Sequence, residues 1–248
     1  MACGANKKLP ICFAEISAGR VIPRALPPAE AERIPRGPGN GEIRDERPFV
    51  ATARQVADAI LAICDRTGWH LSCIAIDAPA APPTIGPRAC ETALRRAGLS
   101  VFQTPSREKW KEIVALCRKY LDTGGDLAHL PYANKIWMLY GFHLFAELRA
   151  RTGAEIIEVY PYAIVHRLGA AHCHKSTATG YKNQLTAMAK RTGWSPAKLE
   201  QQLVVTVPGK RHDRLDAFMA AWVAGLPPER RHPYGMAAQP DDVIWVPA

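Results

Sequence analysis

Two short runs of almost uninterrupted apolar residues, each stopped by proline, constrain the fold of this chain more than any other feature. The first is LSCIAID at residues 71–77, which the segment APAAPP ends, and the second is AEIIEVYP at residues 154–161. Runs of this length and composition are typical of strands that are covered on both faces. Because helical patterns lie between and around them, the order of elements predicts an α/β fold with a layered sheet.

Apolar residues spaced three and four apart predict the helices of this fold. The plainest case is VATARQVADAILAICDRT at residues 50–67, which Gly68 ends. Further helices are expected at 87–98, 107–121, 132–151, 161–168, 180–192 and 196–203, and from residue 212 to Gly225.

The connections and the chain ends carry weaker signals. Residues 10–26 predict a hairpin of two short strands around an Ala-Gly pair. Residues 27–48 are rich in proline, glycine and charge, which predicts an exposed, mobile loop. Short strands are expected at 101–104 and in the tail DDVIWVPA. No long linker or internal repeat interrupts residues 1–248, so we expect a single domain.

The composition points to a class of partner and to a compartment. The formal net charge of +9 favours anionic partners, nucleic acid or phosphorylated metabolites. Seven scattered cysteines without a C-x-x-C motif argue against a disulfide framework and for a reducing cytoplasm. No apolar run approaches the roughly 18–20 residues that span a bilayer. We therefore expect a cytoplasmic protein that binds nucleic acid and no membrane.

Four acids fall where a binding site is expected. Asp77 ends the first buried strand and Glu158 lies near the end of the second, and in open α/β sheets such strand ends line the ligand crevice. Asp213 and Asp216 lie three residues apart at the start of an apolar helix, so they share a face of it. Less specific roles stay open, namely capping of a turn or helix by the aspartates and a salt bridge for Glu158.

Together the acids predict a site for a hard cation. Mg²⁺ and Mn²⁺ prefer oxygen ligands, and two such ions can activate water and stabilise the leaving oxygen of a phosphodiester. We expect Asp77, Asp213 and Asp216 to bind the metal, and Glu158 to bind it or to orient the water. The carboxylates of Asp77 and Asp216 should then lie roughly 4–8 Å apart. Alternatively a lysine or arginine takes the metal's place, and the acids form a salt-bridge network.

The motifs AIDAP, RACETALRRAGLSVFQTP, IIEVYP and HDRLDAFMAAWVAG follow one another in residues 70–248. This ordered set resembles the domain-of-unknown-function 429 family, described as predicted nucleases with a ribonuclease H-like fold. HDRLDA is also similar to the last acidic motif of Holliday-junction resolvases, which share that fold. The resemblance implies a mixed sheet with helices on both faces, helical insertions and a carboxylate metal centre.

The resemblance also assigns roles to single residues. The four acids named above match the acidic motifs of the family and are the implied catalytic residues. Arg88 and Glu91 match a polar pair in the intervening helix, and Lys175 and Tyr181 match the Lys and Gly-Tyr region that follows. Arg88, Lys175 and Tyr181, together with the neighbouring Lys182, are therefore expected to contact the substrate, while a solvated basic face is the alternative for the lysines.

One departure from the family concerns the first strand. Ribonuclease H-like enzymes usually end that strand with Asp in a pattern like G-[IV]-D, and this chain has none. PICFAEI resembles the second strand instead, so we expect the first strand to lie upstream of Met1. In the alternative, Glu15 substitutes for the missing Asp.

Other chemical motifs are weaker. HCHK at residues 172–175 lacks the second ligand cluster that a zinc site needs. Trp110 lies among basic residues and could stack on a base, although packing in the core is the stronger expectation. Trp137, Tyr140 and Phe145 are expected in the core. Neither a G-x-x-x-x-G-K-[ST] loop nor a G-x-G-x-x-G fingerprint occurs.

Two functions of different classes follow. The first is a metal-dependent nuclease that hydrolyses phosphodiester bonds in nucleic acid. The second is a non-catalytic protein that binds nucleic acid or acts as a scaffold, having kept the fold and lost the active centre. A phosphotransferase acting on a small molecule is a weaker third, because no phosphate-binding loop is visible.

Overall fold

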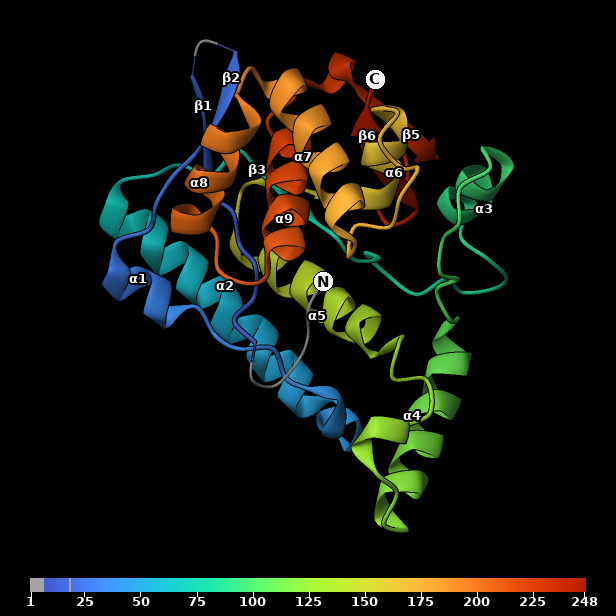
Figure 1. The fold of residues 1–248 in the computed structure, drawn as a ribbon. Coiled ribbons are helices and arrows are strands. Elements are labelled where there is room, and N and C mark those ends of the chain that lie inside the picture. Colours follow the sequence, from blue (N-terminus) through green and yellow to red (C-terminus); the bar gives the residue numbers. More distant parts are fainter. Residues whose placement is uncertain (1–6, 18) are drawn as a thin grey trace.

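A computed structural model describes residues 7–17 and 19–248 of the chain (Figure 1). The chain alternates strands and helices, as predicted. In order, the elements are β1 (Ala14–Ser17), β2 (Arg20–Pro23), α1 (Pro28–Arg33), η1 (Asn40–Arg44), α2 (Arg47–Thr67), β3 (Cys73–Ile76), α3 (Ala89–Arg96), α4 (Arg107–Asp122), η2 (Leu127–His129), α5 (Ile136–Arg151), β4 (Glu155–Glu158), α6 (Pro161–Arg167), α7 (Ala178–Thr192), α8 (Pro196–Thr206), α9 (Arg211–Ala224), η3 (Pro228–Arg230), β5 (Arg231–Gly235) and β6 (Val243–Pro247).

The described strands pair two by two. β1 and β2 form the predicted antiparallel hairpin, of which the turn residue Ala18 lies outside the described residues. β3 and β4, the two buried runs, are parallel neighbours with Ile76 opposite Glu158. β5 and β6 are antiparallel, and a bridge between Val159 and Trp245 places β6 beside the end of β4. The α/β class is therefore confirmed, with small sheets.

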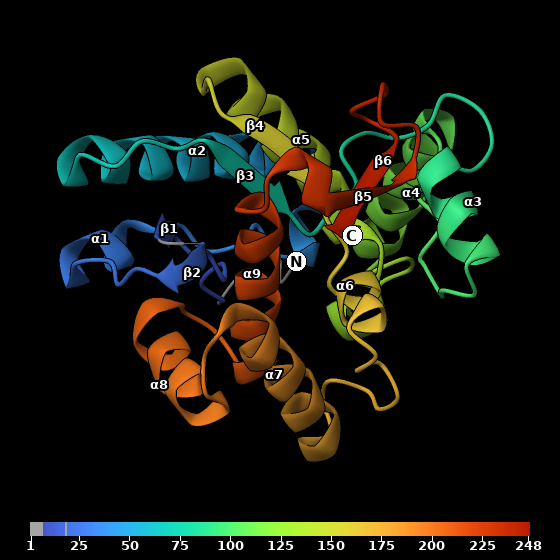
Figure 2. The ribbon, with the colours of Figure 1, turned by 90° about the horizontal axis from the view of Figure 1, so that it is seen from above.

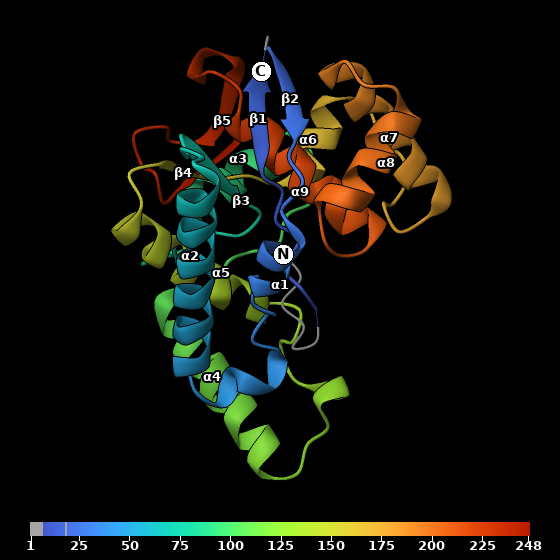
Figure 3. The same ribbon diagram turned by 90° about the vertical axis from the view of Figure 1, so that its left-hand side faces the viewer.

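Helices cover both faces of the β3–β4 pair. Successive side chains of a strand point to opposite faces, so alternate residues of these two strands enter two different cores. Ile74 and Ile156, which are paired, pack into a core with α2 and α5. Ala75 and Ile157, the next pair, pack into a second core with α7, α8 and α9. Figure 2 shows α9 between the strands and α7 and α8, and Figure 3 shows α2 and α5 on the opposite side.

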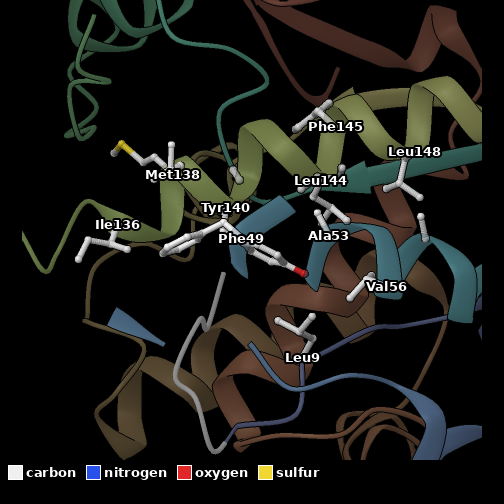
Figure 4. Packing of buried hydrophobic residues seen from close by; sticks show 14 of the residues in the cluster. Leu9, Phe49, Ala53, Val56, Ile136, Met138, Tyr140, Leu144, Phe145 and Leu148 are labelled. Atoms are coloured by element: carbon white, nitrogen blue, oxygen red, sulfur yellow. The ribbon is translucent and has the colours of Figure 1, made fainter. Parts of the chain in front are cut away.

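The first core is closed by the long helices α2 and α5, which lie side by side (Figure 1). Phe49, Ala53 and Val56 of α2 face Tyr140 and Leu144 of α5 (Figure 4). Gly68 ends α2 in the left-handed conformation, φ 69°, as a C-terminal glycine should. Apolar residues at i, i+3, i+4 and i+7 thus drive both the helix and its burial.

Four aromatic residues were predicted to lie in this core. Trp110 is only 4% exposed and packs edge-on against Phe142, so it is a core residue and not a stacking platform. Tyr140 and Phe145 are buried as expected. Trp137 is only partly buried, and its indole N–H donates to the Asn134 carbonyl oxygen.

The prediction of a loop over residues 27–48 was wrong in part. The segment contains α1 and η1, because the proline at its start can begin a helix and because Ile34 and Ile43 are buried. Glu30 of α1 accepts two hydrogen bonds from Arg66 of α2, which holds α1 against that helix. Proline, glycine and charge indicate a loop only where no apolar anchor is buried.

Of two further strand predictions, the strand at 101–104 was wrong and the strand in the tail is confirmed. Residues 101–104 form no strand, because the Thr104 N–H donates to the Glu91 carboxylate and not to a neighbouring strand. The tail does form the predicted strand, β6, but its partner β5 was not predicted. β5 contains Pro233, which is typical of edge strands and hides a strand from pattern analysis.

Among the helices of the described residues, none has the length and apolar character that crossing a membrane requires.

Candidate functional site

Three of the predicted acids come together with a lysine at one end of a large cavity. The cavity has a volume of about 610 Å³ and is bounded by β1, β3 and α9. Asp77 lines it where β3 ends, and Asp213 and Asp216 line it where α9 begins. Lys175, from the loop before α7, lines it as well. The end of a strand and the start of a helix thus place three carboxylates and one ammonium group at the same end of one cavity.

Asp216 is the most buried of these acids, with 8% of its surface exposed. It follows Asp213 by three residues, so both side chains lie on one face of α9. Burial, with a smaller contribution from the charge of Asp77, raises the pKa of Asp216 to about 6, although the Lys175 ammonium opposes the rise. The carboxyl group can therefore gain or lose a proton close to neutral pH.

Lys175 pairs with Asp216 through a hydrogen-bonded ion pair. Burial by itself lowers the pKa of Lys175, but the Asp216 carboxylate and two further aspartates outweigh it and raise the pKa above its ordinary value. Lys175 therefore stays charged beside Asp216. It is the one predicted substrate-binding residue that the structure places among the acids.

The loop that carries Lys175 is fixed by the first turn of α7. The Thr177 hydroxyl caps that helix by accepting from the Gly180 N–H at 3.0 Å, and it donates to the His174 carbonyl oxygen. A Cβ on Gly180 would lie 2.1 Å from that carbonyl oxygen, so only glycine lets the loop approach the helix this closely.

Replacing Gly180 with alanine should therefore lower the free energy of unfolding by about 1–3 kcal/mol, because the loop backbone must move away from the helix. Urea denaturation of the variant measures this loss. Gly153→Ala is the matched control, since a Cβ at Gly153 would meet open space. Equal midpoints for Gly180→Ala and the unmodified chain would contradict the close approach.

Asp213 and the segment before it form the outer part of the site. His212 Nε2 lies 3.4 Å from Asp213 Oδ1, and both side chains are partly buried. Gly209, at φ 107°, brings the preceding turn close to Asp213, because a Cβ there would lie 3.7 Å from the Asp213 Cβ. His212 is thus a neighbour of the acids. Glu15, the alternative first-strand acid, lines the same cavity but pairs with Arg24 at 3.4 Å.

The described residues do not fit the predicted Mg²⁺ or Mn²⁺ centre as they are arranged. In this part of the chain no three His, Cys, Asp or Glu side chains come together in a way that could hold a metal ion. The Lys175 ammonium contacts Asp216 where a cation would neutralise it. The arrangement corresponds to the alternative expectation, in which a basic side chain takes the place of the metal.

Glu158 does not join the aspartates. Its carboxylate accepts from both terminal nitrogens of Arg88, at 2.8 and 2.5 Å, and from the Ala80 N–H at 2.9 Å. The reason is the strand pleat. Glu158 is paired with Ile76, so its side chain leaves the sheet on that face, whereas Asp77 follows one residue later and belongs to the opposite face.

Arg88 is correspondingly not available to a substrate. Arg88 and Glu158 are 2% and 3% exposed. Burial alone lowers the pKa of Arg88, but the charge and hydrogen bonds of Glu158 outweigh it and raise the pKa above its ordinary value. The pair is a buried structural salt bridge, the less specific role that the sequence left open for Glu158.

Two further predicted substrate residues have different surroundings. Tyr181 is 6% exposed, and the Arg211 guanidinium lies over its ring, 4.9 Å from the centroid. One face of its ring is therefore covered by Arg211, and little of the side chain is open to solvent. Lys182, the next residue, is exposed. Since Lys210 and Arg211 at the start of α9 are exposed as well, cationic side chains are available near the acids.

Sequence reasoning missed Asp242, which holds the buried pair in place. Its carboxylate accepts from the Ala89 and Cys90 N–H groups at 2.8 and 3.0 Å, and so caps α3 from a distant part of the chain. The neighbouring Asp241 carbonyl oxygen accepts from Arg88 at 2.7 Å. No local pattern reveals a cap that comes from a residue more than a hundred positions away.

The chain was compared with known proteins and with models of protein families. Searches of curated proteins and of solved structures found no match. One family model, described as a protein of unknown function (DUF429), matches residues 31–234. That span contains Asp77, Glu158, Lys175 and both acids of α9. The match covers most of the chain, and the protein therefore belongs to the DUF429 family.

Proposed function

We propose that this protein hydrolyses phosphodiester bonds in nucleic acid and that Asp77, Lys175 and Asp216 form its reaction centre. The observation that carries the proposal is the convergence of these side chains, from three separate parts of the chain, on one cavity. A carboxyl group with a pKa of about 6 is suited to general acid–base catalysis at neutral pH. The ribonuclease H-like fold is part of the same proposal, and the helices on both faces of β3–β4 support it.

The roles follow from charge and burial. Ionised Asp216 accepts a proton from the water that attacks phosphorus, the P–O bond to the leaving oxygen breaks, and that oxygen takes a proton from bulk water while Asp216 returns its proton to solvent. Asp77 holds that water by accepting its second proton in a hydrogen bond. The Lys175 ammonium moves from Asp216 to a non-bridging phosphate oxygen, where it balances the charge that builds up in the transition state.

The substrate class follows from the charge of the surface. The chain carries a net charge of +9, and Lys210 and Arg211 are exposed at the start of α9, close in sequence to Asp213. Cations that contact successive phosphates release counterions, so we expect binding of nucleic acid to weaken steeply as salt is added. A small neutral substrate would not show this dependence.

Mg²⁺ or Mn²⁺ is the proposed cofactor, provided that it displaces Lys175 from Asp216. Because Lys175 contacts Asp216, an added cation must first displace that ammonium group. The steps above use only the chain's own residues.

The test is a cleavage panel with the purified chain. Labelled single-stranded DNA, duplex DNA, RNA and a four-way junction are incubated with EDTA, Mg²⁺ or Mn²⁺, and products are resolved by size. We expect cleavage of at least one substrate, and loss of that cleavage in Asp77→Asn. Asp65→Asn is the matched control, because Asp65 is an exposed carboxylate on α2 away from the cavity. Equal cleavage by Asp77→Asn and the unmodified chain would remove Asp77 from the reaction centre.

A second candidate function is binding of nucleic acid without catalysis. One observation favours it, namely the ion pair between Lys175 and Asp216, which leaves the acids in a salt-bridge network. In that case fluorescence anisotropy detects salt-dependent binding, every lane of the panel stays uncut, and Asp77→Asn binds as tightly as the unmodified chain. Cleavage that depends on Asp77 excludes this candidate.

A further inference from the structure

The cavity beside the acids has the form of a slot between the edges of two strands. Residues 9–16, which include β1, line one side, and residues 68–77, which include β3, line the other. Figure 2 shows β1 and β3 as separate strands on the same side of α9. Within the described residues β1 pairs with β2 alone and β3 with β4 alone. Each strand therefore turns one unpaired edge away from its partner.

The edge of β3 that faces the slot can be assigned residue by residue. The carbonyl oxygens of Ser72 and Ile76 accept from N–H groups of the β4 side at 3.0 Å. Backbone groups of successive residues point to opposite sides of a strand. The N–H and C=O groups of Cys73 and Ala75 therefore point away from β4, and both residues line the slot.

The same reasoning gives the edge of β1. The Phe13 carbonyl oxygen accepts from the Arg24 N–H at 2.8 Å, so Phe13 and every second residue after it point toward β2. Cys12, Ala14 and Ile16 then present their backbone groups on the other side, and all three line the slot. Two rows of backbone donors and acceptors thus face one space from opposite sides.

Helices close the slot above and below. Ala217, Ala221 and Ala224 line it at a helical spacing along α9, and these small side chains leave the space open. On the other face it is lined by Val56 of α2 and Leu148 of α5, which belong to the first core. A space between two strand edges and under two helical layers has the surroundings of a central strand in an α/β sheet.

We propose that this slot binds an extended, apolar polypeptide strand that adds to both edges. The lining of seven residues from 71 to 77 matches a strand of about 23 Å at roughly 3.3 Å per residue. Main-chain hydrogen bonds on both sides would join β2–β1 and β3–β4 into one sheet, as in other cases of strand addition. The apolar helices on both faces require apolar side chains on the bound strand.

The backbone edges select a polypeptide over a lipid. An acyl chain fills apolar space but leaves the backbone groups of both edges without partners, and unpaired buried backbone groups are costly. Only another backbone in extended form supplies donors and acceptors at the spacing of a strand. The inference concerns what the slot binds, and it holds whether or not the neighbouring acids catalyse a reaction.

The test uses a synthetic peptide of seven alternating valine and alanine residues, which is apolar on both faces, with two serines at each end for solubility. At a hundredfold excess over its Kd, the peptide should raise the Tm of the chain by roughly 5–10 °C. Hydrogen exchange of the Cys12, Ala14, Cys73 and Ala75 amides should slow by on the order of tenfold or more, because these N–H groups become bonded.

Controls identify the mode of binding. Two peptides N-methylated at alternate residues, one for each edge, should both bind more weakly, since the strand is bonded on two sides. Ala221→Phe fills the slot and should abolish binding, whereas Ala178→Phe, at an exposed position on α7, should bind as the unmodified chain does. Dodecanoate should leave the amides of both edges unprotected. Absence of any peptide effect on these amides, or protection by dodecanoate alone, would overturn the proposal.

Discussion

Replacing Arg88 with alanine should lower the free energy of unfolding by about 3–5 kcal/mol. The Glu158 carboxylate would then be buried with only the Ala80 N–H as a hydrogen-bond donor, and an uncompensated charge in the interior is strongly unfavourable. Urea denaturation of the variant and the unmodified chain measures the difference. The loss should shrink at acidic pH, because a Glu158 without its partner takes up a proton more readily in the folded state than in the unfolded state.

Two variants separate the buried pair from an ordinary surface interaction. Arg95→Ala removes an arginine from the same helix, but Arg95 is 39% exposed and lies 3.7 Å from Glu91, so about 0–1 kcal/mol is expected. The double variant Arg88→Met, Glu158→Leu should recover most of the stability, since it leaves no charge unpaired. A loss for Arg88→Ala no larger than that for Arg95→Ala would show that the pair does not hold β4 and α3 together.

Replacing Asp216 with asparagine should lower the rate of phosphodiester cleavage by about 10²- to 10⁴-fold, the usual contribution of a general base. Asparagine keeps the shape of the side chain and a hydrogen-bond acceptor for Lys175, but it cannot accept a proton from water. The measurement is kcat/KM on the substrate that the unmodified chain cleaves best. An unchanged rate would mean that the carboxylate of Asp216 does not act as the base.

The pH dependence gives an independent reading of the same group. Because Asp216 acts in its ionised form, kcat/KM of the unmodified chain should rise with pH and level off above about 6, the pKa of this carboxyl group. The stability should change in the opposite direction. The folded-state pKa is raised, so the protonated form stabilises the fold below the ordinary pKa, and this contribution is lost as the pH rises through about 6. Both dependences should be absent in Asp216→Asn.

The elements of this fold could be predicted where one local pattern decides them. Apolar residues at helical spacing, followed by Gly68, predicted α2. The apolar runs before Asp77 and at Glu158 predicted two strands, which are neighbours in the structure. Predictions failed where long-range contacts decide. The segment 27–48 folds into α1 and η1 because its few apolar residues find a core, and residues 101–104 stay irregular because the Glu91 carboxylate takes the Thr104 N–H.

For the site, the sequence by itself determined that Asp77 stands at the end of a buried strand and that Asp213 and Asp216 share a face of α9. These are local matters, set by a strand period of two and a helix period of 3.6 residues. Only the tertiary structure decided which charges meet. Lys175 and Asp216 are 41 positions apart, and Arg88 and Glu158 are 70 apart. Such pairs are chosen because a buried charge must find a partner within the packed fold, and spacing along the chain carries no record of that choice.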